Sequence, residues 1–168
     1  MYKRNWCEKR VVEQCNLRGM KMHYTKDIID SAEHIDIIGV ANSITITADV
    51  KGPSRISKRD KTYSHTHRWL EIRNNNGLRG SLFGSATHLV IASPKGWLWL
   101  DRNELAGESV LRYIENVGKT KEGDDWHTRA VVGRNSIIIA APYSYLYKRA
   151  QRRWHDNELF NKYYAKNK

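Results

Sequence analysis

The clearest alternation of hydrophobic and polar positions lies in residues 44–51. Alternation with a period of two residues is typical of a β-strand with one buried face. The polar face ends in Asp49 and Lys51, whose side chains project from the same side, roughly 6–7 Å apart along the strand. A second apolar run just upstream contains Asp36, and the short turn between the runs predicts an antiparallel hairpin that brings Asp36 near Asp49. The core-facing side chains of the later strand are expected to be Ile44, Ile46, Ala48 and Val50.

Periodicity and turn residues predict the other elements of the chain. Helices are expected at residues 4–17 and 102–116, and the tail from residue 143 onwards is helical in propensity. Further strands are expected at residues 20–24, 34–39, 69–73, 88–92, 97–100, 129–132 and 136–141. Asp101 is expected to cap the second helix. The apolar side of that helix is expected to consist of Leu105, Val110, Leu111 and Ile114.

Glu8 is an anomaly of the first helix, because helical spacing points it into the stripe formed by Val11, Val12 and Cys15. A carboxylate on that face needs a partner, since burying it unpaired is unfavourable. Two explanations stay open. Glu8 either lies at the edge of the stripe or in an ion pair, or it takes part in a metal site. Cys7 and Cys15 are separated by about 12 Å of helical rise, which is too far for a disulfide.

Composition and charge limit the class of protein. A chain of 168 residues with 40% hydrophobic residues is typical of one globular domain, expected to span residues 1–168. The 29 basic and 18 acidic residues give a net charge of +11, which favours a polyanionic partner, nucleic acid first. No apolar run is long enough for a membrane span, no signal-peptide pattern is visible, and no cysteine spacing suits zinc. These features predict a cytoplasmic protein without a membrane partner.

Residues 52–68 are polar, basic and without periodicity, so this segment is expected to be a loop. One interpretation is that it grips a phosphate backbone, and the alternative is an ordinary solvated loop. The candidate DNA-binding residues are Arg55, Lys58, Arg59, Lys61 and Arg68. His65 and His67 form either a metal site or a surface pair. The basic tail at about residues 155–168 follows a stretch of interleaved aromatic and basic residues that either stacks on bases or packs as a terminal helix.

The order of these features resembles the PD-(D/E)XK nuclease superfamily. The resemblance is carried by a helix with Glu8, a strand with Asp36 and a strand that ends Asp49-Val50-Lys51. The segments that follow, at residues 69–71, 75–77 and 80–84, are similar to small phage-type members, including Holliday-junction resolvase-like proteins. The resemblance covers about residues 5–100. Ile35 stands where the superfamily commonly has proline, and the second acid is an aspartate rather than a glutamate.

The resemblance implies an α/β fold with a mixed central β-sheet flanked by helices, the restriction-endonuclease-like core. It also implies a Mg²⁺ site, in which Mn²⁺ can substitute, because hard oxygen ligands suit these ions. The implied metal ligands are the carboxylates of Asp36, Asp49 and Glu8 and the carbonyl of Val50. Lys51 would orient or deprotonate the attacking water. Glu71 is either an additional ligand or an ion-pair partner of Arg73.

The activity that the resemblance implies is Mg²⁺-dependent hydrolysis of phosphodiester bonds in DNA, leaving 5′-phosphate and 3′-hydroxyl ends. Branched or otherwise structured DNA is the expected substrate, as in recombination, and a junction-resolving enzyme implies a homodimer because it makes two symmetric cuts. Two alternatives remain. One is a non-catalytic nucleic-acid-binding protein on the same fold. The other is a general or restriction-type nuclease, for which this chain offers little room for added recognition elements.

Overall fold

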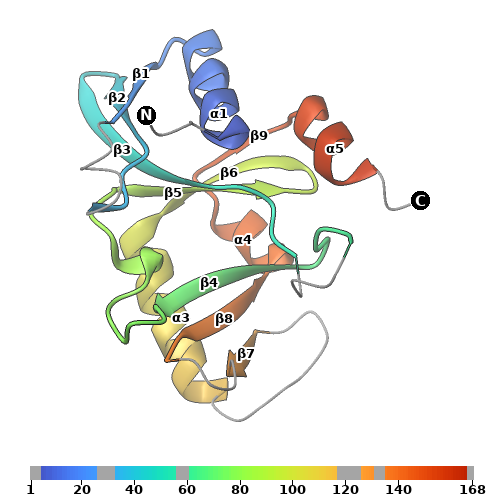
Figure 1. Ribbon diagram of the computed structural model, residues 1–168. Helices are drawn as coiled ribbons and strands as arrows, with labels where there is room; N and C mark the ends of the chain where they lie inside the picture. Colours follow the sequence, from blue (N-terminus) through green and yellow to red (C-terminus); the bar gives the residue numbers. More distant parts are fainter. Residues whose placement is uncertain (1–4, 26–32, 56–60, 117–125, 131–134, 166–168) are drawn as a thin grey trace.

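The structure is a computed structural model that describes residues 5–25, 33–55, 61–116, 126–130 and 135–165 (Figure 1). It has an α/β fold with a mixed central sheet and flanking helices, which confirms the predicted fold class. The helices are α1 (Trp6–Leu17), α3 (Arg102–Asn116), α4 (Tyr143–Arg149) and α5 (Asn157–Tyr163), with a 3₁₀ helix η1 (Ser81–Phe83). The strands are β1 (Lys21–Tyr24), β2 (Ile37–Ala41), β3 (Ile44–Lys51), β4 (His67–Arg73), β5 (His88–Ser93), β6 (Gly96–Asp101), β7 (His127–Ala130), β8 (Ile137–Pro142) and β9 (Arg152–Trp154).

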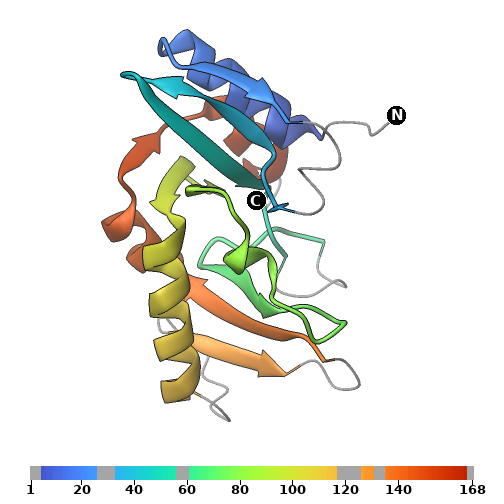
Figure 2. The same ribbon diagram turned by 90° about the vertical axis from the view of Figure 1, so that its left-hand side faces the viewer.

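Two sheets organise the molecule. The central sheet has six strands in the order β1-β2-β3-β5-β6-β9, and β3 and β5 are its one parallel pair. The second sheet has three antiparallel strands in the order β4-β8-β7. Helices α1 and α5 lie on one face of the central sheet, and α3, α4 and the second sheet lie on the other (Figures 1 and 2). The central sheet is therefore the middle layer.

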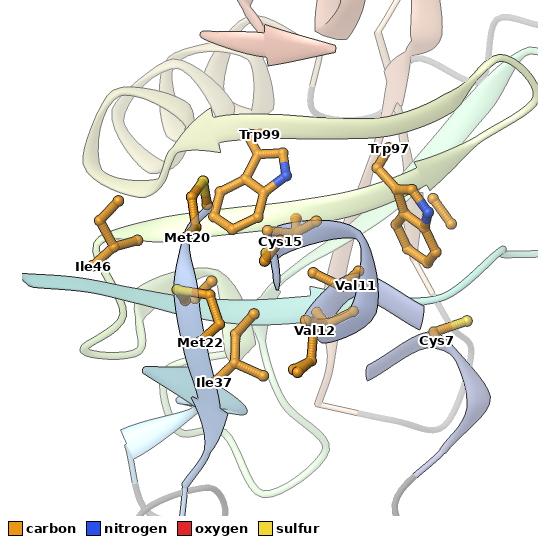
Figure 3. Close-up of a cluster of buried hydrophobic side chains, with 14 of the residues drawn as sticks. Cys7, Val11, Val12, Cys15, Met20, Met22, Ile37, Ile46, Trp97 and Trp99 are labelled. Carbon is orange, nitrogen blue, oxygen red and sulfur yellow. The ribbon is translucent and has the colours of Figure 1, made fainter. Parts of the chain in front are cut away.

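Because both faces of the central sheet are covered, β5 and β6 contribute alternate residues to two separate cores. On the α1 side, Trp97 and Trp99 point from β6 toward Val11 and Cys15 (Figure 3). On the other side, Leu98 and the residues alternating with it in β5 and β6 pack against α3, α4 and the second sheet. This explains why the sequences of β5 and β6 read as nearly continuous apolar runs. Cys15 and Cys7 of α1 are buried free thiols, as the helical spacing predicts.

The predicted β2–β3 hairpin is confirmed, with the two strands antiparallel in the register Ile37↔Ala48. Its turn consists of Asn42 and Ser43, both with positive φ (51° and 64°), a conformation that matches the twist of a two-residue hairpin. The prediction that Ile44 faces the core is wrong, since this side chain is 66% exposed directly after the turn of the hairpin. The rest of that apolar face is buried as expected.

Helix α3 has the predicted limits, and Asp101 caps it by accepting a hydrogen bond from the Glu104 N–H at 2.9 Å. The predicted apolar side is only partly right. Leu111 and Ile114 are 58% and 66% exposed, because they lie outside the helix face that packs against the rest of the molecule. The buried positions follow the i, i+3, i+4, i+7 spacing and are Arg102, Leu105, Ala106 and Ser109.

The tail does not form one continuous helix. Helix α4 ends at Arg149, and β9 then pairs antiparallel with β6 at the edge of the central sheet before α5 begins. Hydrogen bonding at the otherwise open edge of β6 favours this strand over helical propensity. Residues 69–73 form a strand, as predicted. This strand, β4, belongs to the second sheet. Within the described residues, no helix is long and apolar enough to cross a membrane.

Candidate functional site

Asp49 lies on the buried middle strand β3. Ile46, Ala48 and Val50 of this strand pack on the α1 side, so Asp49 and Lys51 project to the opposite face, toward the second sheet. The carboxylate is almost inaccessible, with Asp49 only 2% exposed. Its Oδ1 atom lies 2.8 Å from the Lys51 Nζ atom. The acid and the lysine therefore share one strand face, as their spacing of two residues predicts, and they form an ion pair on it.

Asp36 directly precedes β2 and is also buried. Its backbone N–H donates to the Ala48 carbonyl at 3.0 Å, and its Oδ2 atom accepts a hydrogen bond from the Val50 N–H at 2.6 Å. The side chain thus occupies a position where the strand ladder would otherwise supply the acceptor. The hairpin therefore brings Asp36 against the residue that follows Asp49, as the hairpin prediction requires. Strand β2 begins three residues later than predicted, at Ile37.

Arg102 completes the surroundings of Asp49. Its Nη2 atom donates to Asp49 Oδ2 at 2.7 Å and to the His34 carbonyl at 3.4 Å, and the residue is 1% exposed. Burial lowers the pKa of the Arg102 guanidinium, and the carboxylates of Asp49 and Asp36 oppose this effect. Sequence reasoning missed this residue, because it opens a helix 53 positions after Asp49 and carries no local motif.

Glu8 is buried, with an exposure of 2%, as its place in the apolar stripe of α1 predicts. Its Oε1 atom accepts a hydrogen bond from the Asn5 side-chain amide, and its N–H donates to Asn5 Oδ1 at 3.0 Å, so the pair caps α1. Helix α1 covers the face of the central sheet opposite to Asp49. Within the described segments, no three His, Cys, Asp or Glu residues are grouped so that they could hold a metal ion. Glu8 and the two aspartates are therefore not assembled as one ligand set.

The two aspartates still suit a hard divalent cation. Mg²⁺ usually takes one or two protein carboxylates and fills its other positions with water and substrate phosphate. A carboxylate offers about four lone-pair sites, so Asp49 keeps free acceptor capacity after binding Lys51 and Arg102. The chemistry of Asp36, Asp49 and the Val50 carbonyl therefore fits such an ion, with few protein ligands and a large share of solvent.

A cavity of about 180 Å³ adjoins this site between the two sheets. Its polar lining includes Lys51, whose side chain is 25% exposed, together with Glu71 and Ser81. Within the described residues Glu71 forms no ion pair with Arg73, and its role as an additional metal ligand stays a prediction. The Glu71 carboxylate accepts from the Ser81 N–H at 3.4 Å, and Arg73 Nε donates to the Asn135 carbonyl at 2.8 Å. The full lining is Lys51, Arg68, Trp69, Leu70, Glu71, Ser81, Leu82 and Leu89.

The basic candidates divide into three groups. Arg55 and Lys61 are exposed, and the Arg55 guanidinium lies 5.0 Å from the Tyr63 ring centre. Arg68 does not belong to an exposed loop as predicted, because it is the second residue of β4, is buried, and donates to the Gly52 carbonyl. Lys58 and Arg59 lie outside the described residues.

The two histidines of this region do not form a surface pair. His65 is exposed and its ring packs edge-on against Tyr164 at 5.2 Å between centres. His67 is buried in β4, where its ring lies 4.7 Å from that of His127. The start of β4 accounts for the difference, because His67 is the first residue of this strand of the second sheet and His65 precedes it.

Comparison of the chain with family models, with curated proteins and with solved structures finds no match. The resemblance to PD-(D/E)XK nucleases therefore stays a prediction from the sequence.

Proposed function

We propose that this protein is a metal-dependent DNA endonuclease that hydrolyses phosphodiester bonds, with a preference for branched or otherwise structured DNA. The observation that carries the proposal is the grouping of Asp36, Asp49 and Lys51, of which Lys51 lines the cavity between the two sheets. Two buried carboxylates next to a partly exposed lysine suit a cation, a phosphate and a water in one place. The volume of about 180 Å³ exceeds that of several water molecules.

Each residue has a distinct task in this proposal. Asp36, Asp49 and the Val50 carbonyl would hold Mg²⁺, or Mn²⁺ in its place. When bound, the ion supplies Lewis-acid chemistry that activates water and neutralises phosphate charge. The Lys51 ammonium lies at the cavity and would donate a hydrogen bond to a phosphate oxygen, which stabilises the charge that develops there. Its ion pair with Asp49 fixes its position before the substrate arrives.

The choice of a nucleic acid rests on charge, and the choice of DNA and of a branched substrate rests on the family resemblance. A net charge of +11 favours a polyanion, and cleavage of a phosphodiester requires that the polyanion be a nucleic acid. Resolution of a four-way junction needs two symmetric cuts, so this form of the proposal includes a homodimer with one site in each subunit.

A non-catalytic nucleic-acid-binding protein is the second candidate, and two observations favour it. Both oxygens of Asp49 already bind cations of the protein, Lys51 at 2.8 Å and Arg102 at 2.7 Å. Within the described segments there is also no three-residue ligand group for a metal. With both oxygens paired in this way, Asp49 can have a purely structural role.

Cleavage of labelled four-way junction, flap and linear duplex, with Mg²⁺ and with EDTA, tests the two candidates. The variants are Asp49→Asn and Lys51→Ala, with Lys95→Ala in the exposed β5–β6 turn as the control. We expect metal-dependent cutting, lowered at least about 100-fold in both site variants and unchanged in the control. Binding of the junction should survive in all three proteins.

The outcomes separate the alternatives. Symmetric cuts in the junction alone, together with a dimer in analytical ultracentrifugation, support the junction-selective form. Equal cutting of all three substrates keeps the nuclease and removes its selectivity for branched DNA. Tight binding without cutting in Mg²⁺ or Mn²⁺ supports the second candidate, and full turnover by both site variants refutes the proposed site.

A further inference from the structure

Arg102 is a buried cation with an incomplete set of hydrogen bonds. It donates through Nη2 to Asp49 Oδ2 and to the His34 carbonyl. The Nε and Nη1 atoms are buried, and within the described residues they have no hydrogen-bond partner. Burial of an arginine in this state is unfavourable unless a strong opposite charge compensates for it. The compensating charges are those of Asp49 and, at longer range, Asp36.

A second arginine of the same chain shows the contrast. Arg10 grips Asp156 with two nitrogens, Nε at 2.9 Å and Nη2 at 3.1 Å, which is the usual two-pronged pairing of a structural arginine. Arg102 instead takes one oxygen of Asp49 and leaves the other to Lys51. The carboxylate is thus divided between two cations, one buried and one facing the cavity. An arginine that only stabilised the fold could bind both oxygens of one carboxylate, as Arg10 does, whereas Arg102 binds only one oxygen of Asp49.

Among the described residues at the site, two positive side chains stand with two negative ones. The two cations, Lys51 and Arg102, face the two buried carboxylates, Asp36 and Asp49. A divalent cation on the same carboxylates would supply the same two positive charges. Once such an ion is bound, Lys51 can turn to a phosphate, because its side chain is partly exposed. Arg102, at 1% exposure, cannot leave and remains beside Asp49.

We propose that Arg102 is the internal counter-ion of Asp49, holding its carboxylate in place without a divalent cation and competing with that cation for Oδ2. Arg102 is then a positioning residue that keeps the site folded before metal binds and weakens metal binding. The inference rests on the proposed function, since it concerns the same carboxylates. It adds a specific consequence. Loss of Arg102 should lower the stability of the protein without metal and raise its affinity for the metal.

The first part of the test measures stability without metal, in EDTA. The proteins are the parent, Arg102→Met, Asp49→Asn and the double variant, and the readout is the melting temperature. We expect Arg102→Met to lower it strongly in the parent and much less when Asp49→Asn has already removed the buried charge. Arg112→Met, on the exposed side of α3, is the control and should change it little. An equal loss in both backgrounds would show that Arg102 merely fills space.

The second part measures the response to Mn²⁺ by thermal shift, without DNA. The Mn²⁺ concentration that gives half of the maximal stabilisation should fall about tenfold in Arg102→Met, which corresponds to the loss of one close charge pair. Arg102→Lys should lower it as well, because a shorter point charge cannot keep the same contact at Oδ2. This variant also keeps the test decisive if Arg102→Met does not fold.

Failure of this inference differs from failure of the nuclease proposal. A parent that binds Mn²⁺ through Asp49, with the same midpoint in both Arg102 variants, overturns the counter-ion and leaves the nuclease intact. A parent without any response whose Arg102 variants acquire one supports the counter-ion, whatever the cleavage assay shows. No response to Mn²⁺ in any of these proteins overturns the counter-ion, and the cleavage assay then decides the nuclease separately.

Discussion

Gly84 lies where three segments meet around the guanidinium of Arg102. A Cβ atom at this position would lie 2.2 Å from Arg102 Nη1, 2.6 Å from His34 Cβ and 2.8 Å from the Glu33 carbonyl oxygen. One of these neighbours is backbone and another belongs to a buried ion pair, so neither can move without disturbing the surroundings of Asp49. The backbone of Gly84 is in an extended conformation that any residue adopts, so the constraint is space alone.

Gly84→Ala is therefore expected to lower the free energy of unfolding by about 2–3 kcal/mol, the usual effect of overpacking a tight interior. It should also reduce any metal-dependent cleavage, because the displaced group is the partner of Asp49. Gly107→Ala is the matched control. Gly107 lies within α3 with open space around it, so alanine should raise stability by about 0.5–1 kcal/mol through helix propensity. Urea unfolding of both variants checks the pair, and similar effects at the two glycines would contradict the packing argument.

Asp156 joins helices α1 and α5 to strand β6 of the central sheet that they cover. It caps α5 by accepting hydrogen bonds from the N–H groups of Glu158 and Leu159. It also accepts hydrogen bonds from Arg10 of α1 and from the Trp97 indole of β6, the latter at 2.8 Å. Burial raises the pKa of this carboxyl, but the hydrogen bonds from Arg10 and Trp97 outweigh it, and the net direction is down.

A carboxyl group with a lowered pKa in the folded state stabilises the protein above its unfolded pKa of about 3.9, and this stabilisation is lost as the pH falls through the folded value. Asp156→Asn should thus lower the free energy of unfolding by about 3 kcal/mol at pH 7. The difference from the parent should shrink as the pH falls below about 4. Glu158→Gln, which removes an exposed partner of Arg10, should lower stability by less than about 1 kcal/mol. Urea unfolding from pH 7 to pH 2.5 checks this, and a gap independent of pH would contradict the linkage.

Elements defined by neighbouring residues could be predicted from the sequence. The β2–β3 hairpin and the Asp101 cap depend on turn residues and periodicity within a few positions, and both were found. The partition of strands into two sheets and the pairing of β9 with β6 depend on contacts between distant segments. Arg102 shows the same limit at the candidate site, because only the packing of α3 against the sheet brings it to Asp49. Tertiary contacts thus decide the features that local pattern leaves open.

At the scale of the whole molecule, basic and aromatic side chains from three segments gather at the end of β3. The Trp6 and Tyr63 rings each lie within 6 Å of the Tyr163 ring, at 5.6 Å and 5.2 Å between centres. The Lys162 ammonium lies 5.0 Å from the Trp6 ring, and Arg55 stacks over Tyr63. We call these five residues the aromatic-basic surface. Cations that are held on half-buried rings are well placed to contact a phosphate backbone.

Neutralising this surface is expected to weaken DNA binding through the loss of phosphate contacts. Each released counterion contributes to the slope of the logarithm of affinity against the logarithm of salt concentration, so every lost contact should lower the slope by about 0.9. Arg55→Ala with Lys162→Ala should lower it by about 2 units, and Lys148→Ala on α4, across the central sheet, should leave it unchanged. Fluorescence anisotropy with a labelled junction between 50 and 300 mM salt measures both. The slope is measured because affinity at a single salt concentration can fall for many reasons. An unchanged slope in the double variant would mean that other residues contact the DNA phosphates.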